Sequence, residues 1–263
     1  MSKITQSLTI LASMLALGLH AAPAEAQNTR SFVSATSGSD SNACTRSAPC
    51  QTFAFAITQT NAGGEVNTLD RGEYGTVTID KSISIVSGLG EAGISVPPDG
   101  TGITINAGPH DKINLRGLII EGAGVGNRGT QFNTGGSLNI QNSVIRNHKG
   151  NGVFFQPNAS SKLFMSNTLV SDNDGEGIAI LPSGSGAVTA ALNRVEVNHN
   201  FDGILVDGRN STGTPLNVVA GNHALSIVSA TETGHALTGV MVRNTSGPLK
   251  HASKIVNRFG IPQ

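Results

Sequence analysis

The chain has 263 residues, with 17 basic and 17 acidic side chains and no tryptophan. Charged residues make up only 13%, about half the usual share. The 33 glycines are about 12.5% of the chain, against an average of roughly 7%. This composition excludes a coiled coil, and 38% hydrophobic residues at zero net charge argue against intrinsic disorder. A neutral chain provides no long-range field for nucleic acid or anionic lipid, so we expect no nucleic-acid partner. A turn-rich, all-β protein with a packed core remains.

Residues 1–26 have the three parts of a secretory signal peptide: Lys3 in a short polar start, an apolar run from Leu8 to Leu19, and the small-residue site Ala24-Glu25-Ala26. The pattern predicts cleavage after Ala26 and a secreted or periplasmic protein. The apolar run is shorter than the roughly 20 residues that cross a bilayer, and no second such stretch follows. We therefore expect no membrane span; the alternative is that the segment stays as an uncleaved anchor.

Both cysteines, Cys44 and Cys50, follow the predicted cleavage site, with turn-forming residues between them. In an oxidising compartment, two such neighbouring thiols most simply form a disulfide. The enclosed loop is short, so the bond would pin a local hairpin rather than stabilise the whole domain. A metal site would need further cysteine ligands, and a reactive thiol would need a neighbouring histidine.

The middle of the chain repeats with a period of about 25 residues. Three copies begin at Leu138, Leu163 and Leu192, and each has an asparagine followed ten residues later by a glycine and a β-branched residue: Asn142 and Gly152-Val153, Asn167 and Gly177-Ile178, Asn193 and Gly203-Ile204. Weaker copies flank them, upstream over Ile113 to Phe132 and downstream over Val218 to Val228 and Val240 to Val242. A repeat of this length predicts a solenoid.

Within each copy the apolar runs are too short for helices and are broken by glycine or asparagine, so each copy reads as two or three short strands. Stacked copies pair their strands in parallel and share one core. Asn147, Asp172 and Asn198 then form a structural ladder whose side chains hydrogen-bond between turns. Gly152, Gly177 and Gly203 occupy a corner that requires positive φ or close backbone approach.

This repeat resembles the right-handed parallel β-helix of the pectate-lyase-like (pectin lyase fold) superfamily. The N-terminal segment is similar to the opening of many secreted bacterial members, through Phe32-Val33-Ser34, Gly38-Ser39-Asp40-Ser41-Asn42, Pro49-Cys50-Gln51-Thr52-Phe53 and Ala56-Ile57. The resemblance implies a short helix capped by Thr52 over the first turn. The expected organisation is a signal peptide (1–26), an N-terminal cap with the disulfide (27–62), the β-helix (63–243) and a C-terminal tail (244–263) that either caps the solenoid or leaves an open edge.

The superfamily contains lyases, hydrolases, epimerases and proteins without known activity, so the chemistry must come from the residues. Its enzymes carry their site on the strand after the corner glycine. Alternation there points Phe154, Ala179 and Leu205 outward in one column and Gln156, Leu181 and Asp207 outward in the next. One further copy in each direction adds Gln131, Asn133, Val228 and Ala230, and this face is largely neutral. The hydrolase signatures Asn-Thr-Asp, Asp-Asp and Gly-His-Gly are absent. A catalytic site of the familiar types is therefore disfavoured.

The richest polar cluster lies in the turn before the corner glycine. The alignment stacks His148, Asn173 and His199 in one column, Lys149, Asp174 and Asn200 in a second, and Asn151, Glu176 and Asp202 in a third. Asp174, Glu176 and Asp202 offer the oxygen ligands that calcium binds, while His148, Lys149 and His199 suit an acidic sugar. The alternative, which the sequence favours, is that these are solvated turn residues that tolerate left-handed backbone.

Two functions follow from these patterns. The first and preferred one is a non-catalytic protein whose long side binds polysaccharide or another surface ligand. The second is a carbohydrate-active enzyme, a lyase or epimerase on uronate polymers, that uses the turn cluster.

Overall fold

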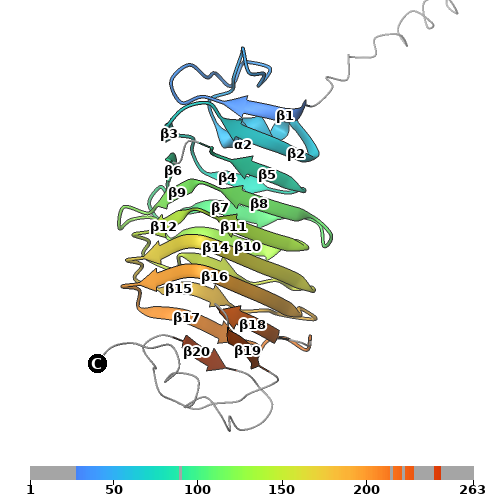
Figure 1. The fold of residues 1–263 in the computed structure, drawn as a ribbon, viewed down its shortest axis with the longest axis vertical. Helices are drawn as coiled ribbons and strands as arrows, with labels where there is room; N and C mark the ends of the chain where they lie inside the picture. Colours follow the sequence, from blue (N-terminus) through green and yellow to red (C-terminus); the bar gives the residue numbers. More distant parts are fainter. Residues whose placement is uncertain (1–27, 89–90, 214–215, 221–222, 228–239, 244–263) are drawn as a thin grey trace, which may run out of the picture.

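The structure is a computed structural model that describes residues 28–88, 91–213, 216–220, 223–227 and 240–243. There the chain winds as a right-handed parallel β-helix, from β1 at the top of Figure 1 to β20 at the bottom. The fold predicted from the repeat is confirmed. The predicted signal peptide (1–26) and tail (244–263) lie outside the described residues. No helix in the described ranges is long and apolar enough to cross a membrane.

Two parallel sheets form the walls of the solenoid. The larger has thirteen strands: β1 (Asn28–Val33), β2 (Thr60–Thr68), β3 (Gly72–Glu73), β5 (Ile83–Val86), β6 (Ala92–Ser95), β8 (Lys112–Arg116), β9 (Leu118–Glu121), β11 (Ser137–Gln141), β12 (Val144–Arg146), β14 (Ser161–Ser171), β16 (Val188–Asn198), β18 (Leu216–Ala220) and β19 (His223–Ile227). The smaller has seven: β4 (Val77–Ile79), β7 (Thr101–Asn106), β10 (Arg128–Thr134), β13 (Val153–Phe155), β15 (Glu176–Ile180), β17 (Asp202–Asp207) and β20 (Val240–Arg243).

The thirteen-stranded sheet bends around a corner, because β11 and β12 both pair with the single long strand β14. Each full turn of the chain thus has three sides, two from this sheet and one from the seven-stranded sheet behind it (Figure 1). In-register pairing stacks like residues inside, for example Ile83 on Ile113 and Ile113 on Leu138, all at most 1% exposed. Phe132 and Phe155 stack with ring centroids 4.4 Å apart. Each such buried side chain contributes roughly 1.5–3 kcal/mol.

The N-terminal segment is joined to the solenoid through its first strand. β1 pairs in parallel with β2, so the expected boundary at residue 62 falls inside β2. Between them lies the helix α2 (Phe53–Thr58), whose N-cap Thr52 accepts a hydrogen bond from the Phe55 N–H at 3.1 Å, as the resemblance implied. The predicted disulfide between Cys44 and Cys50 is present.

Within the thirteen-stranded sheet, parallel pairing ends at β18. Its partner β19 runs antiparallel to it, so the expected downstream repeat over Val218 to Val228 is wrong in that part. The strand β20 does pair in parallel with β17, as the downstream copy over Val240 to Val242 predicted.

The third repeat is shifted by one residue from the predicted alignment. Asn198 pairs with Ser171, 27 positions earlier, whereas Asp202 pairs with Glu176, 26 positions earlier. The turn between β16 and β17 is therefore one residue shorter than its counterpart. The residue beneath Asp172 is His199 and not the predicted Asn198.

Backbone conformation identifies two ladders of left-handed residues. The first comprises Asn147 (φ 59°), Asp172 (φ 57°) and His199 (φ 52°), which corrects the predicted ladder at its third member. The second lies at the bend of the thirteen-stranded sheet and comprises Asn142 (φ 50°), Asn167 (φ 48°) and Arg194 (φ 51°). Asn167 Nδ2 donates to Asn142 Oδ1 at 3.1 Å, and Arg194 Nε donates to Asn167 Oδ1 at 2.6 Å.

Candidate functional site

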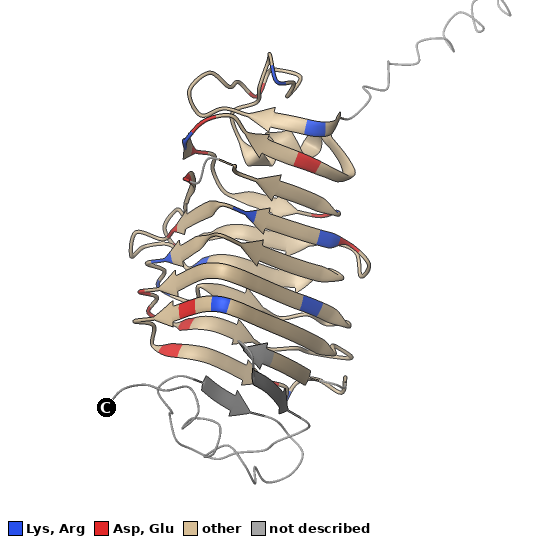
Figure 2. Cartoon of the chain, in the orientation of Figure 1, with Lys and Arg blue, Asp and Glu red and all other residues tan. Residues whose placement is uncertain are grey.

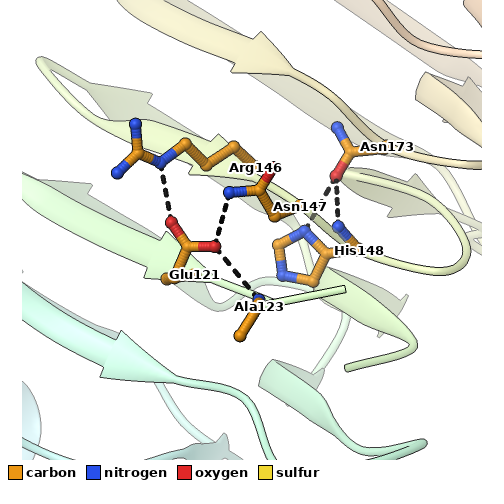
Figure 3. Close-up of polar contacts among 6 residues, drawn as sticks. All are labelled: Glu121, Ala123, Arg146, Asn147, His148 and Asn173. Atoms are coloured by element: carbon orange, nitrogen blue, oxygen red, sulfur yellow. Dashed lines mark hydrogen bonds and ion pairs between the residues drawn. The ribbon is translucent and has the colours of Figure 1, made fainter. Parts of the chain in front are cut away.

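The predicted turn cluster lies at the edge where the thirteen-stranded sheet passes into the seven-stranded sheet. One turn upstream of it, Glu121 at the end of β9 accepts three hydrogen bonds, from Arg146 Nε at 2.7 Å, Asn147 Nδ2 at 2.7 Å and the Ala123 N–H at 3.0 Å (Figure 3). Burial acts to raise the pKa of Glu121, but the hydrogen bonds from Asn147 and Arg146 outweigh it, so the pKa lies below its usual value. The Glu121 carboxylate therefore links two successive turns of the solenoid through hydrogen bonds.

His148 is a core residue rather than a ligand. It is 1% exposed, its Nδ1 lies 2.8 Å from Asn173 Oδ1, and its Nε2 is buried without a partner. Figure 3 shows the ring nitrogen and the backbone nitrogen of His148 both directed at the side-chain oxygen of Asn173. Burial lowers its pKa, so the ring is neutral at neutral pH. Its predicted role in binding an acidic sugar is wrong, because a ligand has no access to the ring.

The predicted first column is also wrong in its last member. Asn173 Nδ2 donates to Asn200 Oδ1 at 2.6 Å, so the column is His148, Asn173 and Asn200. His199 instead extends into solvent with its side chain 82% exposed, 3.8 Å from Asp172 Oδ1. The cause is the shorter turn of the third repeat. For the same reason Asn200 does not follow Asp174 in the second column.

The remaining members of the cluster are dispersed. Lys149 pairs with Asp99 one turn away, at 3.1 Å between Nζ and Oδ1. The third column is confirmed, because Asn151 Nδ2 donates to Glu176 Oε2 and Glu176 pairs in register with Asp202. Asp174 is exposed on the turn between these columns. Within the described ranges, no three side chains of His, Cys, Asp or Glu lie together in a group that could hold a metal ion.

A different group lies on the outer face of the seven-stranded sheet. Arg128, at the start of β10, stacks its guanidinium over the Phe154 ring at 4.1 Å from the centroid and donates from Nη1 to Gln131 Oε1 at 3.0 Å. Its Nε is buried without a partner. Burial lowers its pKa, yet an arginine stays charged at neutral pH. Among the described residues no carboxylate forms an ion pair with it.

From Gln131 a row of amides continues across the same face. Gln131 Nε2 donates to Asn133 Oδ1 at 3.0 Å, and Asn133 Nδ2 donates to Asn106 Oδ1 at 2.8 Å. Each donor occupies the acceptor of its neighbour, so the row holds a fixed order of donors and acceptors. We call Arg128, Gln131, Asn133, Asn106 and Phe154 the arginine-amide row.

A shallow groove of about 300 Å³ adjoins this row on β4 and β7, lined by Ala54, Thr76, Val77, Thr78, Thr101 and Thr104. The register places it beside the row, because Arg128 pairs with Thr101 and Gln131 pairs with Thr104. The face thus combines one cation, a row of amides and several hydroxyls, which are groups that bind sugar hydroxyls and carboxylates.

No family model matches this chain, and no curated protein matches it either. Among solved structures, the crystal structure of pectate lyase Pel9A is similar, with a TM-score of 0.38 and 13% identity, over 84% of this chain and 78% of that one. The two sequences are too different for an activity to be transferred from one to the other. The function is therefore argued from this chain's own residues.

Sequence reasoning found part of the outer face and missed Arg128. The register confirms the column Gln131, Phe154, Ala179 and Leu205, although Ala179 is fully buried. Strict alternation counted back from Gln131 places Arg128 on the inner face, so the alternation pattern does not identify Arg128 as an outward residue. The available signal was a lone arginine in Asn127-Arg128-Gly129, beside a glycine that is common to this corner.

Proposed function

We propose that this chain binds an acidic polysaccharide, without cleaving it, on the outer face of the seven-stranded sheet. The observation that carries the proposal is Arg128, a partly desolvated cation for which the described residues provide no carboxylate partner. A desolvated charge without a counter-ion is unfavourable, and a carboxylate matches the planar fork of donors on a guanidinium. A uronate carboxylate fills this role.

The neighbours of Arg128 support a sugar as the carrier of that carboxylate. Phe154 holds the guanidinium by stacking, which reduces the rotamer freedom lost on binding. The amides of Gln131 and Asn133 continue along β10 from this point, and Asn106 and the threonine hydroxyls of the groove lie on or beside the neighbouring strands. They suit a linear polymer with a hydroxyl on every ring.

Binding without cleavage is supported by the side chains on this face. Hydrolysis of a glycosidic bond uses paired carboxylates, and elimination uses a positioned base beside carboxylates or calcium. The outward column from β4 to β17 reads Thr78, Thr104, Gln131, Phe154, Ala179 and Leu205. These residues match a binding surface better than they match either reaction.

The disulfide between Cys44 and Cys50 supports a location outside the cytoplasm, since such bonds persist in oxidising compartments. Extracellular or envelope polysaccharide is then within reach. A secreted or periplasmic protein remains the proposal for its localisation.

Calorimetric titration with short galacturonate oligomers, alongside neutral dextran oligomers, tests the proposal. We expect binding to the uronate only, and a loss of about 10-fold or more in Arg128→Ala, because a hydrogen bond to a charged group contributes about 1.5–3 kcal/mol. The matched control is Arg71→Ala, which removes an exposed arginine that already pairs with Glu91 at 3.2 Å. This control should bind as the unaltered chain does.

Equal binding by both variants, or equal binding of dextran and uronate, would contradict the proposal. A rise in ultraviolet absorbance from unsaturated uronate during incubation with polygalacturonate would replace it with the lyase alternative. Circular dichroism of Arg128→Ala checks that the fold is retained, so that lost binding reports on the site.

A further inference from the structure

A second polar surface lies on the front of the molecule in Figure 2, on the outer side of β8, β11 and the first halves of β14 and β16. In-register pairing arranges its outward residues in three columns. They are Lys112, Ser137, Lys162 and Thr189; Asn114, Asn139, Phe164 and Ala191; and Arg116, Gln141, Ser166 and Asn193. We call these residues the front face.

The cations of the front face have no acidic partner among the residues that the structure describes. Lys112, Arg116 and Lys162 are exposed and form no ion pair within the described part of the chain, and no position of the three columns is a carboxylate. The acidic side chains lie instead mainly in the turns (Figure 2), with Glu65 on β2 and Glu196 on the second half of β16, outside the three columns. The nearest turn carboxylate, Asp111, already accepts from Ser82 Oγ at 2.6 Å and the Gly108 N–H at 2.7 Å.

The rest of the front face offers hydrogen bonds and one exposed ring. Asn114 Nδ2 donates to Ser84 Oγ at 3.2 Å, and Asn139 Nδ2 donates to Asn114 Oδ1 at 3.4 Å, so the amides form an ordered row between the lysine and arginine columns. Phe164, in the same column, is 38% exposed. A flat sheet face with cations on both sides of an amide row suits an extended anionic chain with hydroxyls.

We propose that the front face is a second binding surface for acidic polysaccharide, so that one molecule bridges two polymer chains. The inference rests on the proposed function for the identity of the polymer. The two surfaces face away from each other, because the core lies between the front face and the seven-stranded sheet behind it (Figure 1). One short oligomer therefore cannot occupy both.

The spacing of charge favours polysaccharide over nucleic acid. Lys112 and Lys162 are two strands apart, about 10 Å, and Lys112 and Arg116 are four residues apart along β8, about 13 Å. Duplex DNA carries one charge per roughly 1.7 Å and is bound by denser arrays of cations. A polymer with one carboxylate per sugar and neutral hydroxyls between matches the sparse cations and the amides of this face.

Calorimetric titration of the full chain with a short galacturonate oligomer counts the sites. We expect two oligomers per chain, and one per chain in both Arg128→Ala and the double variant Lys112→Ser with Lys162→Ser. Ser137, which lies between these two lysines, shows that serine fits the column. The control double variant, Arg71→Ser with Lys149→Ser, removes the same charge from residues paired elsewhere and should still bind two.

Long polygalacturonate adds a second readout. The unaltered chain should cross-link it and raise light scattering, whereas each single-surface variant should bind without cross-linking. One site that only Arg128→Ala removes overturns the front-face inference and leaves the proposed function standing. One site that only the double lysine variant removes supports the front face and overturns the proposed function. Preference of the front face for duplex DNA over the oligomer, measured by competition, overturns the choice of polysaccharide.

Discussion

The imidazole Nδ1 of His148 lies 2.8 Å from the side-chain oxygen of Asn173, which also accepts the backbone N–H of His148 at 3.1 Å. Asn173 makes the same pair of contacts one turn later, with Oδ1 of Asn200 at 2.6 Å from its Nδ2 and 3.2 Å from its N–H. Because an amide oxygen can only accept hydrogen bonds, Nδ1 must carry the proton of the neutral ring. Nε2 is then unprotonated, and it is buried without a partner. A histidine thus replaces an amide at the top of an internal ladder.

This arrangement predicts that stability falls on mild acidification. Burial lowers the pKa of His148, and the hydrogen bond with Asn173 and the charge of Glu121 offset this only in part. A histidine with a folded pKa below its unfolded value of about 6.5 binds more protons when unfolded, so its contribution is complete above that pH and is lost as pH falls below it. Urea unfolding between pH 8 and pH 5 should show this decline, and His148→Asn should remove much of it.

His110→Asn is the control for the acid effect, because His110 lies exposed in a turn. It should keep the decline of the unaltered chain. If His148→Asn keeps the same slope of unfolding free energy against pH, the ring is not the group responsible.

Gly152 shows why this corner needs glycine. A Cβ there would lie 2.5 Å from Val170 Cγ1 and 2.7 Å from the carbonyl oxygen of Gly177, the equivalent glycine one turn later. Gly152→Ala should therefore cost about 1–3 kcal/mol of unfolding free energy by overpacking. Gly88→Ala, where a Cβ would meet nothing within 4 Å, should be neutral or slightly stabilising. Equal effects in thermal unfolding would contradict the steric explanation.

The corner also shows how far the sequence predicts this molecule. Ten residues from Asn to Gly, repeated three times, were enough to predict strands, stacking and close approach at Gly152 and Gly177, and Gly152 in fact has no left-handed φ. The third copy also has ten residues from its asparagine to its glycine, but its turn between β16 and β17 is one residue shorter and the segment before that turn is one residue longer. Spacing alone therefore could not reveal that His199, and not Asn198, occupies the ladder position. Loop length is only weakly restricted by energy, which is why the period survives such exchanges.

The candidate site was less predictable than the fold. The residue types identified the polar turn, but they do not show which of its side chains are exposed to solvent. His148 is buried, and Lys149 is paired with Asp99. Arg128 stands out for two reasons: its guanidinium stacks on the Phe154 ring one turn later, and its Nε has no hydrogen-bond partner. Neither feature can be recognised from the residues next to Arg128 in the sequence. Contacts between successive turns determine both outcomes.

Asp70 fastens the N-terminal segment to the solenoid. Its carboxylate accepts from Ser34 Oγ at 2.6 Å, the Ala35 N–H at 2.8 Å, the Thr36 N–H at 3.1 Å and the Tyr74 hydroxyl at 2.5 Å. Burial acts to raise its pKa, but these hydrogen bonds outweigh it and the pKa lies well below the usual value. Asp70→Asn should lower the unfolding free energy at pH 7 by about 2 kcal/mol.

The sign of the pH effect provides the check. A depressed folded pKa means that the ionised group stabilises above its unfolded pKa of about 3.9 and that this contribution is lost as pH falls further. The difference between Asp70→Asn and the unaltered chain should therefore shrink below about pH 4. Tyr74→Phe, which removes one of the donors, should lower stability less than Asp70→Asn; a larger effect would refute the assignment to the carboxylate.

Arg194 occupies the ladder at the bend with φ at 51°, beneath Asn167 and Asn142. Left-handed backbone costs an ordinary residue roughly 1–2 kcal/mol and costs asparagine less. An amide at this position also reaches the Oδ1 of Asn167 that Arg194 Nε now occupies at 2.6 Å. Arg194→Asn should therefore stabilise the chain by about 0.5–1 kcal/mol and raise the unfolding temperature by about 1–4 °C. Arg194→Ala, which loses the hydrogen bond and gains no tolerance for positive φ, should lower it. If Arg194→Asn unfolds at a lower temperature than the unaltered chain, then Arg194 stabilises the fold through more than its hydrogen bond to Asn167, and the prediction is wrong.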